Sequence, residues 1–305
     1  MLVKLFKSNN PLILLFLPFV GVILLFSSLI FSFSLEKTFT LIALLLIILF
    51  NAIYLNKGIN KTILFNKPLY LTALCVTFFS CIDLTSVSYF PLVLANLFLS
   101  FGFLTLIKIQ RQVPCKGIVF NSSCFILLSA ITYPPYLIFI LLPWFALSVI
   151  KSFNVREYLM PFLAILLFMV YGWLFVEFSS LEMISNYYSL FEKGETNSIS
   201  YLHIVVFSAV YLLLILSLII LLRLNSSATN RFKKLSWVMF LFLILALVVS
   251  LLNMYFYNPS QSLLSITIPI SILFPFYLFH SKRQLVVDLF FSLFFIAVLI
   301  MVYYK

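Results

Sequence analysis

The stretch YLHIVVFSAVYLLLILSLIILLR, residues 201–223, contains no Asp, Glu, Lys or Arg until it ends at Arg223. As a helix it is long enough to cross a hydrocarbon layer about 30 Å thick. Comparable apolar runs recur from one end of the 305 residues to the other, and none shows the alternation of barrel strands. A lipid-spanning segment of this kind satisfies its own backbone only as a helix. The sequence therefore predicts an all-α fold, a polytopic transmembrane helical bundle.

The composition supports the same class. The chain is 64% hydrophobic and 9% charged, with a mean hydropathy of +1.21, whereas soluble domains are roughly 25% charged. Apolar runs between charges predict about eleven spans. The pair within residues 117–150 is short and turns at Pro134 and Pro135, so a re-entrant hairpin there would leave nine. The predicted spans are residues 11–33, 38–55, 68–83, 88–108, 117–133, 135–150, 158–178, 201–223, 235–256, 261–279 and 285–304.

The basic residues indicate how the bundle is oriented. With the N-terminus inside, sixteen of the nineteen Lys and Arg residues fall on the inner side, and the exceptions are Lys37, Lys193 and Lys305. Because Lys and Arg are enriched in cytoplasmic loops, the sequence predicts an N-in, C-out topology. The same residues explain the net charge of +11 as anchors beside anionic lipid, so no nucleic-acid partner is expected.

We expect one integral membrane domain over residues 1–305. The first apolar run, residues 11–33, is too long for a signal peptide and no small-residue cleavage site follows it, so we interpret it as a retained span. Walker A, GxGxxG and HExxH motifs are missing. The four cysteines show no CxxC spacing and are expected to be buried free thiols. No metal site or cofactor is expected, because His203 and His280 fall on opposite sides of the predicted bundle.

The longest polar connection is LEMISNYYSLFEKGETNSIS, residues 181–200. Ser179 and Glu182 have the spacing of a capping box, apolar residues follow at helical spacing, and Gly194 is placed to end the helix. The pattern predicts an outward-facing amphipathic interfacial helix over residues 179–194. It is interpreted either as an anchored connector or as a lid over an outward-facing cavity.

A few polar residues are candidates for a site. Asp83 and Glu177 each end a predicted span, and a carboxylate at membrane depth is a catalytic or ion-binding candidate, although water reaches both outer ends. Glu182 and His203, beside the predicted surface helix, are ligand-binding candidates. Asn51, Asn96 and Asn253 lie within or near spans. They are expected to join helices by hydrogen bonds, or to line a polar path if they share one face, which makes Asn96 and Asn253 further ligand candidates.

Three stretches carry a resemblance to a known group of proteins. They are FKSNNP at residues 6–11, SAITYPPYLIFILLPWFALSVIKSFNVREYLMPFLAILLFMVYGWLF at 129–175, and NPSQSLLSITIPISILFPFYLF at 258–279. The shared features are the double-proline turn, Pro143 with Trp144, and Arg156-Glu157-Tyr158 before a proline. The chain resembles an uncharacterised family of bacterial polytopic inner-membrane proteins, defined only as a domain of unknown function. The resemblance implies a location in the bacterial inner membrane and no particular substrate.

The stretch at 129–175 is also distantly similar to membrane glycosyltransferases that use polyprenyl-phosphate sugars. Those enzymes carry acidic residues in their first and second outward loops, where this chain has Glu36 and Asp83. The similarity implies that these two carboxylates are catalytic candidates and that a polyprenyl lipid is a partner. The first loop of those enzymes is long and partly helical, whereas residues 33–38 here form a short turn, and every arginine of this chain is expected inside. Both departures disfavour catalysis.

The sequence thus leaves three functions open. The first is a non-catalytic assembly or scaffold component of a cell-envelope complex, whose partners are other envelope membrane proteins and the lipid bilayer. The second is a permease or flippase-like carrier, which needs a polar path to the midplane. The third is a degenerate lipid-linked glycosyltransferase. The absence of a converging, strongly charged site in the pattern favours the first.

Overall fold

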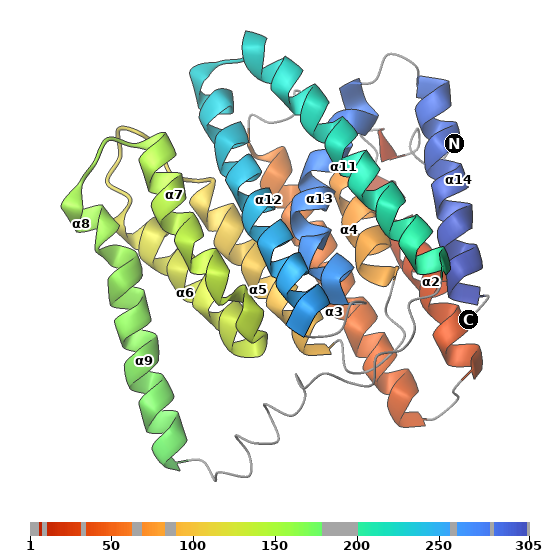
Figure 1. The fold of residues 1–305 in the computed structure, drawn as a ribbon, viewed down its shortest axis with the longest axis horizontal. Helices are drawn as coiled ribbons and strands as arrows, with labels where there is room; N and C mark the ends of the chain where they lie inside the picture. The colour runs from red at the N-terminus through yellow and green to blue at the C-terminus, as the bar shows by residue number, and fades with distance from the viewer. Residues whose placement is uncertain are drawn as a thin grey trace.

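The computed structural model describes residues 6–7, 11–31, 35–62, 69–82, 90–178, 201–256, 261–280 and 284–303. Within these ranges every regular element is a helix, which confirms the predicted all-α class (Figure 1). Each predicted apolar segment is helical, with ends within about five residues of the expected ones, and the segments at 11–33 and 135–150 each consist of two successive helices. The helices are η1 Pro11–Phe16, α2 Leu17–Phe31, α3 Leu35–Asn60, α4 Leu71–Cys81, α5 Phe90–Leu106, α6 Lys116–Thr132, η3 Pro134–Ile140, α7 Leu141–Ile150, α8 Val155–Tyr158, α9 Met160–Phe178, α11 Tyr201–Ser227, α12 Asn230–Phe256, α13 Gln261–His280 and α14 Gln284–Tyr303.

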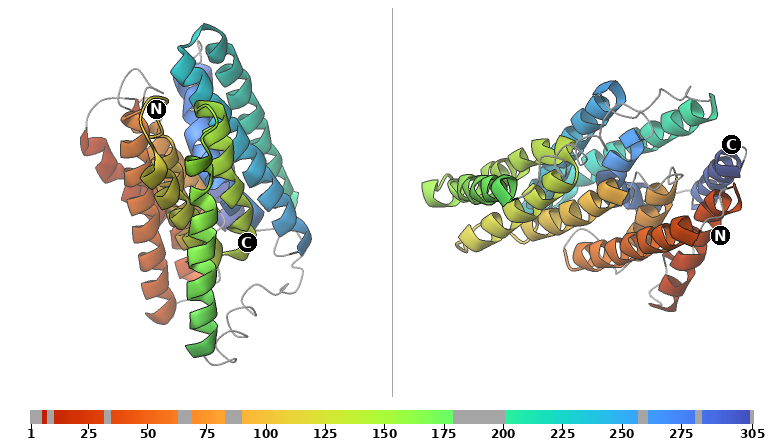
Figure 2. Two further views of the ribbon diagram at one scale, coloured as in Figure 1. Left: turned by 90° about the vertical axis from the view of Figure 1, so that its left-hand side faces the viewer. Right: turned by 90° about the horizontal axis from the view of Figure 1, so that it is seen from below.

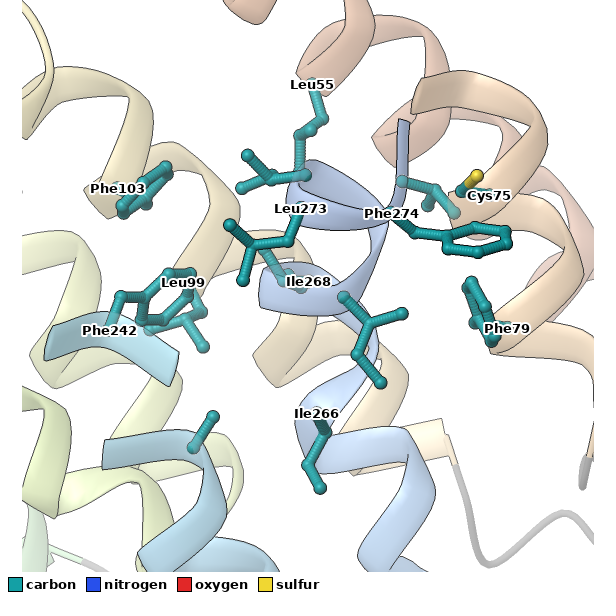
Figure 3. Close-up of a cluster of buried hydrophobic side chains, with 14 of the residues drawn as sticks. Leu55, Cys75, Phe79, Leu99, Phe103, Phe242, Ile266, Ile268, Leu273 and Phe274 are labelled. Carbon is teal, nitrogen blue, oxygen red and sulfur yellow. The ribbon is translucent and has the colours of Figure 1, made fainter. Parts of the chain in front are cut away.

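Helix α13 lies at the centre of the bundle. It packs against α4, α5, α11 and α12, and the residues of its apolar window are almost all buried. In Figure 3, Ile266, Ile268, Leu273 and Phe274 of α13 lie among side chains from several neighbouring helices, including Phe79 of α4. A helix that is apolar on all sides is expected in such a central position.

The remaining helices extend to two edges. On one side α3, α5, α6 and α9 pack in that order, and α9 stands at the edge against α6 and the short α8 (Figures 1 and 2). At the other edge α14 and α2 lie together. The short α4 fills the space between α2, α3 and α13, and all its residues are buried.

Five of the described helices are long and apolar enough to cross a membrane, as judged by length and composition. Of these, α13 is the most buried and α9 the least, with large apolar side chains exposed on most of its surface. The six other apolar helices are shorter. The five segments are Thr38–Asn60, Val155–Leu174, Val205–Ser226, Asn230–Tyr255 and Ser262–His280.

Candidate functional site

Two tyrosines enter the core from the double-proline turn between α6 and α7. Because a residue before proline is pushed out of the helical region, Tyr133 is extended, with φ −145° and ψ 100°, and α6 ends at the residue before it. Pro134 then starts the short helix η3 without needing an N–H donor. The turn places Tyr133 and Tyr136 with their rings edge to face, 5.2 Å apart between centroids, and both are buried.

The first tyrosine contact ties three helices through Asn96. The hydroxyl of Tyr136 donates to Oδ1 of Asn96 over 2.7 Å. The amide nitrogen of Asn96 donates to the Leu264 carbonyl at 2.9 Å and to the Thr267 hydroxyl at 3.2 Å. Asn96 on α5 therefore has both ends of its amide bonded, one to η3 and the other to α13. This matches the rule that buried polar groups are hydrogen-bonded.

The second tyrosine reaches α12. The hydroxyl of Tyr133 donates to Oδ1 of Asn253 on α12 over 2.7 Å. The buried Nδ2 of Asn253 finds no hydrogen-bond partner among the described residues. Asn51 accepts a hydrogen bond from Ser100 over 2.6 Å, which joins α3 to α5. All three asparagines thus lie in the core and bond to side chains of other segments of the bundle.

A series of buried aromatic rings continues from Tyr136 of this polar network. Tyr136 meets Phe139 edge to face, and Phe139 meets Phe242, which in turn stacks on Phe103 at a centroid separation of 4.5 Å. These rings are all buried. The amides therefore lie in a well-packed apolar environment, where they act as fixed ties between helices.

A charged cluster lies at the other ends of α6 and α7, where α6 begins and α7 ends. Glu157, in α8, is only 1% exposed and forms an ion pair with Nζ of Lys151 at 2.8 Å. The backbone N–H of Cys115 donates to Oε1 of Glu157 at 3.1 Å, and its thiol donates to Oε2 at 3.3 Å. Nζ of Lys151 also donates to the Val113 carbonyl at 2.7 Å. One carboxylate thereby fixes the start of α6 to the connection between α7 and α8.

The local sequence explains how this cluster is held. Asn154 caps α8 by accepting a hydrogen bond from the N–H of Arg156, which sets the orientation of the short helix. The indole N–H of Trp144 donates to the Tyr158 carbonyl over 3.0 Å, tying α7 to the end of α8. The turn is therefore fixed on both sides of Glu157.

The cluster changes the ionisation of two groups outside the helical spans. Burial raises the pKa of the Cys115 thiol, and the hydrogen bond and negative charge of Glu157 raise it further, against the opposing effect of Lys151. Burial lowers the pKa of Lys151, but its hydrogen bonds and charge interactions with Glu157 and Cys115 outweigh this, so the net pKa of Lys151 is raised. Cys115 is therefore a neutral thiol near pH 7 and Lys151 is an ammonium ion.

A cavity of about 260 Å³ opens beside this cluster. It lies between the α5–α6 connection, the end of α7 and the start of α12, and its charged lining residues are all basic. Lys234 at its wall donates from Nζ to the Ile150 carbonyl over 2.7 Å, which joins α12 to α7. The lining residues are Ile109, Gln110, Arg111, Gln112, Ile150, Asn230, Arg231, Lys234 and Leu235.

Of the residues expected from sequence to form a site, the structure describes the side chains of Asn96, Asn253 and Glu177, and the two asparagines join the core network through Tyr136 and Tyr133. Glu177 is exposed near the end of α9, at the edge of the bundle. Glu36 and His203 lie in the first turns of α3 and α11, and their side chains are outside the described residues. The helices of Glu36 and Glu177 are separated by α5 and α6. Asp83, Glu182 and the surface helix expected at 179–194 lie outside the described residues.

Asn96 and Asn253 join helices by hydrogen bonds as expected from the sequence, but their partners Tyr136 and Tyr133 and the buried Glu157 were not singled out from the sequence. Tyr133 and Tyr136 were part of the double-proline signal, and a tyrosine on each side of a turn between two short spans is a cue for inward-pointing hydroxyls. Glu157 directly follows Arg156 in a connection that also contains Lys151, and an acid among basic residues is a candidate for an ion pair. In the described residues no three His, Cys, Asp or Glu side chains lie close enough to hold a metal ion.

No known family model matches this chain, and neither a curated protein nor a solved structure matches it. The class of the protein therefore rests on its own helices. Several of them are long and apolar enough for a multi-pass membrane protein.

Proposed function

We propose that this chain is a multi-pass protein of the bacterial inner membrane that serves as a non-catalytic assembly or scaffold component of a cell-envelope complex. It has about eleven spans, the N-terminus inside and the C-terminus outside. Its partners are the lipid bilayer and other envelope membrane proteins. The observation that carries the proposal is the use of the buried Glu157, Asn96 and Asn253 as ties between helices.

The distribution of charge supports the membrane orientation. Lys234 bonds to the end of α7, Lys151 bonds to the connection before α6, and Arg111 and Arg231 line one cavity. These basic residues come from two connections and from the start of α12, yet they gather at one end of the bundle, the upper end in Figure 1, where the α7–α8 connection and the α11–α12 turn lie. A basic end of this kind is typical of the cytoplasmic face.

The buried polar groups support a non-catalytic role. A catalytic carboxylate needs access to its substrate, whereas Glu157 is buried and bonded to Lys151 and Cys115. A carrier needs polar groups that exchange partners along a path, whereas Asn96 is bonded on both sides and packed beside aromatic rings. These contacts favour a rigid bundle over both the flippase-like carrier and the lipid-linked glycosyltransferase that would take a polyprenyl substrate.

The exposed surface of α9 supports the proposal that the partners are other membrane proteins. This helix contacts α6 and α8, its Phe162 packs on Trp144 of α7, and it presents Leu166, Met169 and Trp173 outward. Lipid alone can cover such a surface, but a weakly packed edge helix is also where another membrane protein can pack. The edge position leaves that surface accessible from the plane of the membrane (Figure 2).

The proposal is tested by affinity purification of the tagged full chain from its native membrane in a mild detergent. We expect defined envelope proteins to co-purify at constant ratio. Replacing Leu166 and Met169 by Ala on α9 should weaken that association, whereas replacing Leu212 and Ile215, exposed on α11, should not. Repeated isolation of the unmodified chain as a lone monomer would argue against the scaffold role.

A further inference from the structure

The basic cavity is formed by three segments that are far apart in the sequence. Residues 109–112 connect α5 to α6, Ile150 ends α7, and Asn230, Arg231, Lys234 and Leu235 open α12. The volume of about 260 Å³ lies just below the roughly 300–1,000 Å³ of pockets that enclose whole small molecules. The cavity therefore has room for a head group or a small anion.

The charges that line the cavity have one sign. Arg111 approaches from the loop and Arg231 from the first turn of α12, while Lys234 stands on the next turn. No carboxylate is among the lining residues. Glu157, which follows α7 in the chain, is bonded to Lys151 and Cys115 instead. The cavity lining thus offers two guanidinium groups without a carboxylate beside them, and arginine donors suit the oxygens of a phosphate.

The start of α12 adds to this potential. The helix runs from Asn230 to Phe256, and its first turn belongs to the cavity lining. The N–H of Phe232 is capped by the hydroxyl of Thr229 at 3.5 Å. The unsatisfied N–H groups and the dipole of a long helix make its N-terminus favourable for an anion. Here the N-terminus of α12 adds to the positive potential of the two arginines.

The cavity also has an apolar wall. Ile109, Ile150 and Leu235 are buried, whereas Gln110, Arg111 and Gln112 are exposed. Two large apolar side chains of the same end, Val113 and Phe153, are exposed as well, at 49% and 74%. Apolar neighbours do not stabilise a bound free phosphate ion. They stabilise a bound lipid, because its glycerol and upper acyl carbons follow the phosphate. Basic pockets on the cytoplasmic side of membrane proteins hold such head groups.

We infer that this cavity is a binding site for the phosphate-bearing head group of an anionic membrane lipid, held by Arg111 and Arg231 with Lys234 and the start of α12 behind them. The inference rests on the membrane location proposed above and is independent of the scaffold role. Bound lipid would connect the α5–α6 connection, α7 and α12, which already meet through the hydrogen bonds of Lys234 to Ile150 and of Lys151 to Val113.

The site is tested with the purified full chain in a neutral detergent. Three ligands are titrated by calorimetry: short-chain phosphatidylglycerol, short-chain phosphatidylcholine and inorganic phosphate. The cavity variant carries Arg111→Gln and Arg231→Gln. The matched control carries Arg156→Gln and Arg223→Gln, which removes the same charge from exposed positions outside the cavity. Arg111→Gln alone, in an exposed loop, serves as a second variant that leaves helix packing intact.

We expect phosphatidylglycerol to bind the wild type and the control alike, and the cavity variant at least about tenfold more weakly, because charge-assisted hydrogen bonds are lost. Arg111→Gln alone should show an intermediate loss. Equal weakening in both double variants would overturn the site in favour of general electrostatic attraction. Inorganic phosphate binding as tightly as phosphatidylglycerol would overturn the lipid assignment. Loss of binding here would leave co-purification of partner proteins unaffected, so the two proposals fail separately.

Discussion

The hydroxyl of Tyr136 and the amide oxygen of Asn96 form a hydrogen bond of 2.7 Å between residues that are 40 positions apart. Asn96 continues the connection to Leu264 and Thr267 on α13. A buried amide with both ends bonded to different helices restricts how α5, η3 and α13 can slide past each other. The double-proline turn is therefore tied to the most buried helix of the bundle.

Tyr136→Phe is expected to lower the free energy of unfolding by about 0.6 kcal/mol, and by no more than about 1.7 kcal/mol, the mean and the maximum found for hydrogen bonds between membrane helices. Asn96→Ala should cost more, since it also removes the hydrogen bonds to Leu264 and Thr267 and leaves the Tyr136 hydroxyl without its acceptor. Unfolding of both variants and of the double variant in one detergent gives the coupling energy. Tyr171→Phe, on the exposed surface of α9, is the control. Additive effects of the two core variants would contradict the bond.

Gly102→Ala is expected to destabilise the α5–α6 pair by about 1 to 3 kcal/mol. A Cβ at this position would lie 2.9 Å from Cγ1 of Ile126 and 3.2 Å from the Ser122 carbonyl oxygen, and the backbone cannot move aside cheaply. Small residues allow membrane helices to approach this closely. Gly172→Ala is the control, because a Cβ there meets nothing within 4 Å, so its melting temperature should be unchanged or higher. An equal response at both positions would contradict the close packing.

Glu157→Gln is expected to lower the free energy of unfolding by about 3 kcal/mol, because it leaves the Lys151 ammonium without its carboxylate in a largely buried place. Adding Lys151→Met should restore part of the loss, since the second variant removes the unpaired charge. The measurement is a double-mutant cycle by thermal unfolding. Glu177→Gln, at an exposed position of α9, should have little effect. Failure of Lys151→Met to recover any stability would show that the pair is not coupled.

Cys115 is expected to react slowly with iodoacetamide in the folded protein, because it is 1% exposed and its pKa is raised above the ordinary value of 9.0. The thiolate is the reactive form, so the rate should keep rising as the pH passes 9.0. In Glu157→Gln the negative charge is gone and Lys151 remains, so the pKa of Cys115 should fall and alkylation at pH 8 should be faster. Mass spectrometry of a variant in which Cys115 is the only cysteine follows the reaction. An unchanged rate would contradict the contact.

The helices could be predicted from the sequence because a long apolar run in lipid has one way to satisfy its backbone, and that requirement is local. The partners of Asn96 and Asn253 could not. Tyr133 lies 120 residues from Asn253, and Leu264 lies 168 from Asn96, so these bonds depend on which helices are neighbours. No short-range pattern in a nearly uniform apolar sequence specifies that.

The burial of Glu157 was equally out of reach of the sequence pattern. An acid next to Arg156 in a short polar connection reads as an exposed residue of the inner surface. It is buried because the loop before α6 folds over it and supplies the N–H and thiol of Cys115, 42 positions away. The basic cavity combines residues 109–112 with residues 230–235 in the same way.

The proposed orientation predicts opposite accessibility at the two ends of α9. The segment Val155–Leu174 is long enough to cross the membrane, Ser152 precedes it among basic residues, and Glu177 follows it. Both Ser152 and Glu177 are exposed, so cysteines there should not disturb the packing. In a chain whose own cysteines are replaced by Ala, a membrane-impermeant maleimide should label Glu177→Cys in intact spheroplasts and Ser152→Cys only after permeabilisation. The reverse pattern would overturn the N-in topology, and labelling of both in intact spheroplasts would show that this segment does not cross.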